Sequence, residues 1–524
     1  MRFVSISFPA LVAVAVLIYY RVPLRRRWWV LLAASYLFYS FAGAECVALI
    51  LWTTLITYLT ALLMQRVSDR EASVLDAHRE DWDKPQRKAF RAAEKKKRRG
   101  ILAVGLLLGF GTLAVLKYTG FAASVLRSFG APVTVPSLIL PLGISFYTFQ
   151  SMGYLIDVSR GKGQAERNFF RLALFVSFSP QLLQGPISRF GDLAPQLWEG
   201  HRFDRYGFRS GLCRIVYGYF KKMIVADTAM LAVQKLVGMG DSGTGIYTVL
   251  LILFYSAQIY GDFTGGIDIT IGVAELFGIR LAENFDRPFS SRTVKEYWNR
   301  WHITMGTWFT DYVFFPLSVS GPMQKLSRWS RDHLGNALGK RIPVYLATIA
   351  TWFLTGLWHG AGWNFIVWGL LNCLALLVSQ ELRPLWDRWQ RAFPRLCASA
   401  VWHAFAAART FLLMGLFRSL DCYRDVPLTF RLWRSILTTA NWGTLFDGGL
   451  LNIGLAAGDY AVLFAGIAVI WTVSRLGKTE PLRNRLARRP VLLALCLSLG
   501  VAVILIFGTY GIGFSAGDFI YVQF

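Results

Sequence analysis

The chain has 524 residues, of which 54% are hydrophobic and 15% aromatic, and its formal net charge is +25. So much apolar sequence excludes a soluble protein of several domains, although a charge of this sign in a soluble protein would suggest nucleic acid. The basic residues cluster at the ends of apolar segments, a pattern typical of membrane topology and of contact with anionic headgroups. We therefore expect membrane lipids as partners and no nucleic acid.

The apolar segments predict the fold class. Many of them are about 20 residues long, the length that a helix needs to cross a bilayer. We predict an all-α polytopic membrane protein in a single transmembrane domain, residues 1–524, with roughly 11–12 spans plus short or re-entrant helices around a central tunnel. Six scattered cysteines without a CxxC pair indicate neither a metal site nor a disulfide framework, and we expect no bound cofactor.

The first basic clusters predict the orientation. Residues 3–20 form the first expected span, and the arginine-rich loop after it should stay in the cytoplasm, which places the N-terminus outside. Two further spans, 28–44 and 46–64, bring the chain back inside. Residues 65–100 carry twelve Lys or Arg against seven acids, so we expect a cytoplasmic helical hairpin there.

The middle of the chain is punctuated by Pro, Gly and polar residues. Residues 136–160 and 181–189 predict short or re-entrant helices that line an interior space, because broken backbone at membrane depth must be covered. Residues 211–233 predict another span, interrupted by two adjacent lysines, Lys221 and Lys222.

Three acids, Asp262, Asp268 and Glu275, lie in the apolar run of residues 246–277. Carboxylates in a membrane-spanning segment are candidates for function. Pairing with an arginine or lysine, such as Arg189, is at least as strong an interpretation as catalysis.

The last part of the chain predicts spans at residues 401–417, 460–473 and 491–508. A basic patch at 475–489 should be cytoplasmic, so the final segment, 491–524, runs outward as a helix and ends in an extracytoplasmic aromatic motif. Both termini are thus predicted to lie on the extracytoplasmic side of the membrane.

Two histidines stand in Trp-His contexts, His302 after Trp301 and His359 after Trp358. A histidine at membrane depth is costly unless it is hydrogen-bonded or functional, and a helix-packing role is the simpler alternative. Burial favours the neutral imidazole, which can accept a proton from an attacking hydroxyl. Tryptophans around it would exclude water and protect an acyl group from hydrolysis.

The segments 298–308 and 356–369, which contain these histidines, resemble the two signature segments of the membrane-bound O-acyltransferase family. Residues 141–147, 184–189 and 283–289 also match, so the similarity spans most of residues 1–380. The nearest branch is that of bacterial alginate, peptidoglycan and other polysaccharide O-acetyltransferases. Membership would place the chain in a bacterial inner membrane.

The resemblance implies that His359 is catalytic, with His302 nearby, in a tunnel through the membrane. We expect the tunnel to be formed by the other residues of these segments, namely Trp301, Trp358, Trp363, Asn364 and Asp311. It further implies cytoplasmic acetyl-CoA as donor substrate, an extracytoplasmic partner of the SGNH-esterase type and a polysaccharide acceptor.

The terminal residues 519–524 resemble an aromatic motif of some family members, in which the tyrosine carries the acyl group. Tyr521 is the corresponding residue. A phenol, with a pKa of about 10, leaves more readily than an alkyl alcohol, so an acetyl-tyrosine stays activated. The alternative is an aromatic anchor at the membrane interface.

A transporter or flippase for a lipid-linked sugar is the competing function, with the histidines and buried acids as binding or proton-relay groups. Such a protein would show two pseudo-symmetric halves. The sequence shows no internal similarity of this kind, which favours the enzyme.

Overall fold

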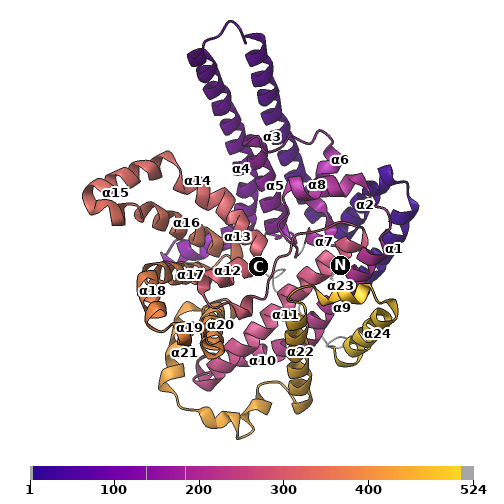
Figure 1. Ribbon diagram of the computed structural model, residues 1–524, viewed down its shortest axis with the longest axis vertical. Helices are drawn as coiled ribbons and strands as arrows, with labels where there is room; N and C mark the ends of the chain where they lie inside the picture. The colour runs from indigo at the N-terminus through magenta and orange to yellow at the C-terminus, as the bar shows by residue number, and fades with distance from the viewer. Residues whose placement is uncertain (1–3, 137, 183, 509–524) are drawn as a thin grey trace. The chain divides into compact units, whose positions relative to one another are not determined.

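A computed structural model describes residues 4–136, 138–182 and 184–508 (Figure 1). Within these ranges the regular structure is helical and no strand is formed; a single isolated bridge pairs Phe285 with Trp301. The chain divides into two compact units. The first comprises Met1–Gly211 and Val273–Leu281, and the second Leu212–Gly272 and Ala282–Phe524.

The first unit contains eight complete α-helices in its described residues. In chain order they are α1 (Ser7–Arg21), α2 (Arg27–Ser40), α3 (Ala44–Ala77), α4 (Lys84–Ser128), α5 (Ile144–Ser159), α6 (Phe169–Ser177), α7 (Ser179–Leu182) and α8 (Phe190–Glu199).

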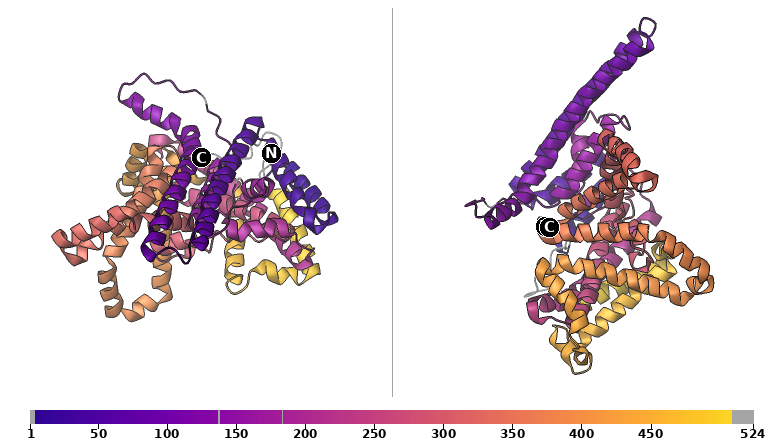
Figure 2. Two further views of the ribbon diagram at one scale, coloured as in Figure 1. Left: turned by 90° about the horizontal axis from the view of Figure 1, so that it is seen from above. Right: turned by 90° about the vertical axis from the view of Figure 1, so that its left-hand side faces the viewer.

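Helices α3 and α4 form the helical hairpin that the charge pattern of residues 65–100 predicts, and they run side by side in every view (Figures 1 and 2). Asp83 caps α4 through a reciprocal capping box with Gln86. Arg98 of α4 pairs with Glu71 of α3 at 2.8 Å, so the basic face is tied to the partner helix. Each helix of the hairpin therefore runs without a break from its apolar part into its charged part.

The Pro- and Gly-punctuated region, residues 136–160, contains a short helix, as predicted. Gly143 caps the start of α5 with a φ of 73°, a left-handed conformation that glycine adopts without strain. Most side chains of α5 are buried, including those of Tyr147, Gln150 and Tyr154. The neighbouring α7 has only four residues. Neither helix is long enough to cross a bilayer.

The second unit holds the remaining helices. They are the second half of α9 (Arg205–Phe220), a π-helical turn η2 (Lys221–Ala226), α10 (Asp227–Gly238), most of α11 (Ile246–Leu276), α12 (Val294–Arg300), α13 (Ile303–Phe309), a second π turn η5 (Thr310–Phe314), α14 (Phe315–Ser318), α15 (Gly321–Gly339), α16 (Ile342–His359), α17 (Trp363–Glu381), α18 (Arg383–Ala392), α19 (Pro394–Ala398), α20 (Ala400–Tyr423), α21 (Val426–Thr438), α22 (Ala457–Leu476), α23 (Leu482–Ala487) and α24 (Pro490–Phe507).

Seven helices in the described ranges are long and apolar enough to cross a membrane: α3, α4, α11, α17, α20, α22 and α24. They include the spans predicted within residues 401–417, 460–473 and 491–508. The expected 11–12 spans would have to include shorter or more polar helices, such as α1, α2 and α16. The fold is that of an all-α polytopic membrane protein.

The predicted span at residues 211–233 is one helical rod, and its interruption is the π turn at Lys221 and Lys222. This rod lies against α11 with its backbone almost in contact. A Cβ on Gly265 would lie 2.7 Å from the Gly218 carbonyl oxygen, and one on Gly261 would lie 2.7 Å from that of Lys221. Small residues four apart are the usual means by which membrane helices approach so closely.

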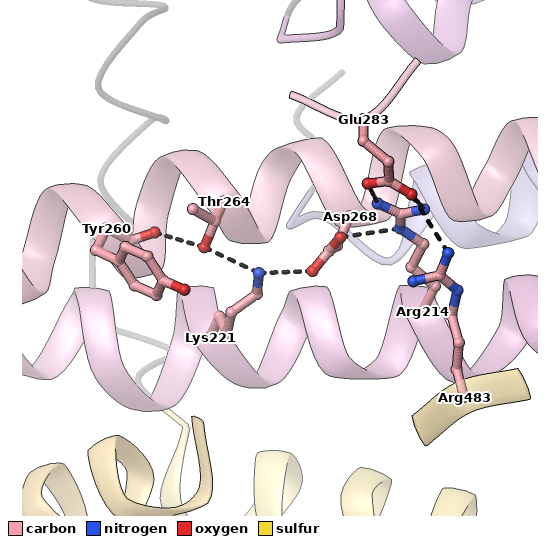
Figure 3. A network of polar contacts seen from close by, with 7 residues as sticks. All are labelled: Arg214, Lys221, Tyr260, Thr264, Asp268, Glu283 and Arg483. Carbon is pink, nitrogen blue, oxygen red and sulfur yellow. Dashed lines mark hydrogen bonds and ion pairs between the residues drawn. The ribbon is translucent and has the colours of Figure 1, made fainter. Parts of the chain in front are cut away.

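This close approach allows three buried cations of the rod, Arg214, Lys221 and Lys222, to reach the acids of α11. Figure 3 shows the contacts of Arg214 and Lys221. Lys221 Nζ lies 2.5 Å from Asp268 Oδ2, and it donates to Thr264 Oγ1 at 2.9 Å. Arg214 binds Asp268 through Nε at 2.9 Å and meets Glu283 with both terminal nitrogens. We call this set, together with Lys222 and its partners, the ionic lattice.

Lys222 completes the ionic lattice one residue further along the rod. Its ammonium lies 2.6 Å from Asp262 Oδ1 and 2.8 Å from Asp227 Oδ1, and all three side chains are almost fully buried. Arg483 also reaches Glu283, at 3.3 Å. Four cations therefore face four acids, so the lattice is neutral. The prediction that the α11 acids pair with basic residues is confirmed for Asp262 and Asp268, through lysines and Arg214.

Replacing Lys222 with Met should destabilise the protein strongly. The change leaves Asp262 and Asp227 buried without their cation, a loss that typically costs about 3–5 kcal/mol. Thermal unfolding in detergent measures it. The matched control is Lys235→Met on the exposed face of α10, which should change stability by no more than about 0.5 kcal/mol. Equal melting temperatures for the two variants would contradict the role given to Lys222.

Candidate functional site

His359 is the last residue of α16, at the turn that joins α16 to α17. Two glycines bring these helices together. A Cβ on Gly369 would lie 2.5 Å from the Trp352 carbonyl oxygen, and one on Gly356 would lie 2.5 Å from that of Phe365. The α16–α17 hairpin is therefore closed by backbone contact, and the turn that holds His359 is fixed at its end.

The turn itself is packed tightly around the imidazole. A Cβ on Gly360 would meet the Phe365 ring, so the residue after His359 has no room for a side chain. The His359 ring stands edge-on to two indoles, Trp358 at 5.0 Å and Trp368 at 4.6 Å between ring centroids. His359 is half-buried between these tryptophans.

His302 is fully buried and adopts a left-handed backbone conformation, with φ 49°, directly before α13. Such positions are costly for non-glycine residues and cluster at functional sites. Asn284 holds this conformation. Its backbone carbonyl accepts from the Ile303 N–H at 3.0 Å, and its side-chain oxygen accepts from the Thr304 N–H at 3.0 Å.

The same Asn284 oxygen determines the tautomer of His302. It lies 3.3 Å from His302 Nδ1, and because it already accepts a backbone N–H it must be an acceptor for the imidazole as well. Nδ1 therefore carries the proton, and Nε2 carries the lone pair of the neutral ring. His302 lies outside the seven long apolar helices, and burial, with a contribution from the Arg418 charge, lowers its pKa to about 3. The ring is neutral at physiological pH.

The two imidazoles lie beside the same indole. Trp358 is 5.0 Å from His359 and 5.7 Å from His302, measured between ring centroids. Phe263 of α11 stands edge-on to His302 at 4.9 Å. The structure thus brings together the two histidines that the sequence singles out 57 positions apart, and surrounds them with aromatic rings.

Trp301 is packed on both sides. Its indole stacks against Tyr297 at 5.8 Å, and the Arg418 guanidinium carbon lies 3.9 Å from the centre of its ring. Arg418 also donates to the Tyr297 hydroxyl at 2.9 Å. Phe285 and Phe289 contact the same indole. Trp301 is thereby held rigidly next to His302.

The other predicted tunnel residues differ in their exposure. Trp358 and Asn364 are buried, whereas Trp363, the first residue of α17, is 58% exposed. Asp311 is half-buried in the π turn η5. Tyr521 lies outside the residues that the structure describes.

The sequence analysis missed three residues of this site: Asn284, Arg418 and Trp368. Asn284 stands in the segment 283–289, and Trp368 is next to last in the second Trp-His segment, so motif position could have indicated both. Arg418, in an apolar helix, is costly in a membrane-spanning segment unless it is paired, and this was the available signal. Trp368 contacts His359, while Trp298 and Trp352 pack behind it.

Residues 164–330 match the model of the membrane-bound O-acyltransferase family. A probable alginate O-acetylase of Azotobacter vinelandii is 32% identical over 82% of this chain and 79% of its own length. A peptidoglycan O-acetyltransferase of Helicobacter pylori is 29% identical over 72% of this chain and 69% of its own. A teichoic acid D-alanyltransferase of Bacillus subtilis is 26% identical over 49% of this chain and 63% of its own length.

The tautomer of His302 can be measured by nitrogen-15 NMR of protein with labelled histidine, the resonance being assigned with His302→Gln. We expect a neutral ring protonated at Nδ1 from pH 7 down to pH 5, because its pKa lies near 3 and the proton enters an unfavourable buried site. Asn284→Ala should let both tautomers appear. Asn299→Ala, at an exposed position of α12, is the control and should leave the spectrum unchanged. A wild-type ring protonated at Nε2 would contradict the assignment.

Proposed function

Because the chain belongs to the membrane-bound O-acyltransferase family, we propose that it takes acetyl groups from cytoplasmic acetyl-CoA and passes them outward for O-acetylation of a polysaccharide. The observation that carries this proposal is the pair of imidazoles that both lie beside Trp358, with His302 neutral. Relatives named for alginate and for peptidoglycan acetylation favour an extracytoplasmic polymer as acceptor.

In the proposed reaction His359 is the general base. A hydroxyl oxygen attacks the thioester carbonyl of acetyl-CoA while the imidazole accepts the hydroxyl proton. The tetrahedral intermediate then collapses, the carbon–sulfur bond breaks, and the imidazolium returns the proton to the departing thiolate. The products are an ester and free CoA. General-base assistance of this kind contributes about 10² to 10⁴-fold to a rate.

His302 is a positioning residue in this scheme, because an imidazole with a pKa of about 3 is a weak base at physiological pH. Its ring is hydrogen-bonded by Asn284 and lies beside Trp358, which also contacts His359. The aromatic surroundings serve the chemistry because a dry site prevents hydrolysis of the thioester. No step requires a metal, and the described residues contain no cluster of three or more metal-ligating side chains.

The positions of the basic segments support entry of the donor from the cytoplasm. The α3–α4 hairpin and the stretch 475–489 carry the excess of Lys and Arg expected of cytoplasmic loops in an inner-membrane protein. In this orientation both termini lie outside. A partner of the SGNH-esterase type would then receive the acetyl group and transfer it to the polymer.

We also propose that Tyr521 carries the acetyl group between this protein and its partner. An acetyl ester of a phenol is more reactive than an alkyl ester, because a phenol of pKa about 10 is the better leaving group. A second transfer to a sugar hydroxyl is then favourable without a further energy source.

His359→Ala should reduce label transfer from radioactive acetyl-CoA by at least about 10²-fold in purified protein, because the base is lost. Acetylation of the polymer in cells should fall in parallel, with protein level unchanged. His403→Ala, at a half-buried histidine of α20 with no role in the scheme, is the matched control and should retain activity. Normal transfer by His359→Ala would rule out the catalytic assignment.

Tyr521→Phe keeps the aromatic ring and removes the hydroxyl. We expect thioester cleavage to persist at a low rate, and acetylation of the polymer to be lost, since the acceptor oxygen is absent. Mass spectrometry of the terminal peptide should show an acetyl group on wild-type protein only. Full polymer acetylation by this variant would rule out the carrier role and leave Tyr521 as an aromatic anchor at the membrane interface.

A further inference from the structure

The second unit contains a cavity of about 760 Å³ between α11, α12, α20 and α22. Its lining includes neither His302 nor His359, so it is separate from the imidazole pair. The two sites share a wall. Phe289 lines the cavity and stacks on Trp301, the neighbour of His302, with 6.1 Å between ring centroids and 19° between planes.

One end of the cavity is strongly basic. Among the described residues, five cations line it, Arg287, Arg292, Arg300, Arg475 and Lys478, against one acid, Glu296. Arg300 is neutralised by Glu296 at 2.8 Å, and Arg287 by Asp286 at 3.0 Å.

The three remaining cations, Arg292, Arg475 and Lys478, are exposed, and no ion pair in the described part of the chain involves them. Arg475 rests on the Trp471 ring at 5.0 Å. The hydroxyls of Ser290 and Ser474 also line the cavity. This end fits a phosphate group, which binds several cations and accepts hydrogen bonds.

The rest of the cavity is lined by apolar side chains. It follows α11 at Leu253 and Ala257, and α22 from Phe464 to Ile470. Phe464 is 61% exposed and Leu253 is 40% exposed, although both lie on helices long enough to span a bilayer. The outer edge of the cavity therefore opens toward the lipid chains.

This apolar wall distinguishes between two kinds of phosphate-bearing ligand. A pantetheine arm carries amides and a hydroxyl, and along this wall they would lose their hydrogen bonds to water without replacement, which costs about 1–3 kcal/mol each. A fatty acyl chain has no such groups and gains by burial. Two cations of the basic end, Arg475 and Lys478, belong to the stretch 475–489, which we predict to be cytoplasmic. They would lie beside the cytoplasmic leaflet, which carries anionic lipid.

We propose that this cavity binds an anionic phospholipid of the cytoplasmic leaflet. The phosphate lies among Arg292, Arg475 and Lys478, and an acyl chain runs between α11 and α22. The acyl chain packs against Phe289 and so supports Trp301 beside His302. The ligand is a resident lipid and not the acyl donor, so the site goes beyond the proposed function.

The test compares retention of phosphatidylglycerol and phosphatidylcholine by purified full-length protein, using native mass spectrometry and a lipid titration. We expect phosphatidylglycerol to be retained preferentially. In the double variant Arg292→Gln/Lys478→Gln its affinity should fall about 25-fold, since each interfacial cation contributes about 5-fold. The control is Lys295→Gln/Arg388→Gln, which removes two exposed cations outside the cavity and should bind as the wild type does.

A second variant tests the apolar part. Ala257→Phe fills the cavity between the helices and should reduce lipid retention while all five cations remain. A third arm adds acetyl-CoA, which should leave bound phosphatidylglycerol in place. Equal retention of the two lipids, unchanged binding by both cavity variants, or displacement of lipid by acetyl-CoA mole for mole would each overturn the proposal. Lipid retention is read without any catalytic assay, so its failure is distinct from failure of the transfer reaction.

Discussion

The contact between α11 and the rod formed by α9, its π turn and α10 is the constraint on which the second unit depends. Glycines on both helices bring the backbones together, and only at that distance do Lys221 and Lys222 reach the acids of α11. A buried charge without a partner is very costly, so either helix without the other is unstable in a bilayer. The π turn adds one residue and thereby directs two adjacent lysines at two different carboxylates.

This constraint extends to the imidazoles through α11. Phe263, one residue after Asp262, contacts both His302 and Trp301. The ionic lattice thus fixes the helix that supports the site from one side, while the glycine-closed α16–α17 hairpin fixes Trp358 and His359 from the other. Charge pairing on one helix and backbone contact on the other together hold these side chains rigidly.

The ionic lattice and the surroundings of His302 differ in their charge. The ionic lattice is neutral and satisfied, so it contributes structure without a strong field. Around His302 one cation, Arg418, stacks on Trp301 and opposes protonation of the nearby imidazole. Arg418 therefore has two effects: it orders the tryptophan, and it keeps the His302 ring neutral.

The sequence by itself determined the helical class, the α3–α4 hairpin and the two Trp-His segments, because hydropathy, charge and short motifs are local properties of the chain. It also indicated that acids of α11 would be paired. Only the tertiary structure decided that Lys222 pairs with Asp262, that Asn284 sets the tautomer of His302, and that both imidazoles lie beside Trp358. These contacts join residues far apart in the chain. They depend on how closely helices pack and at what register, which glycine positions permit but no local pattern specifies.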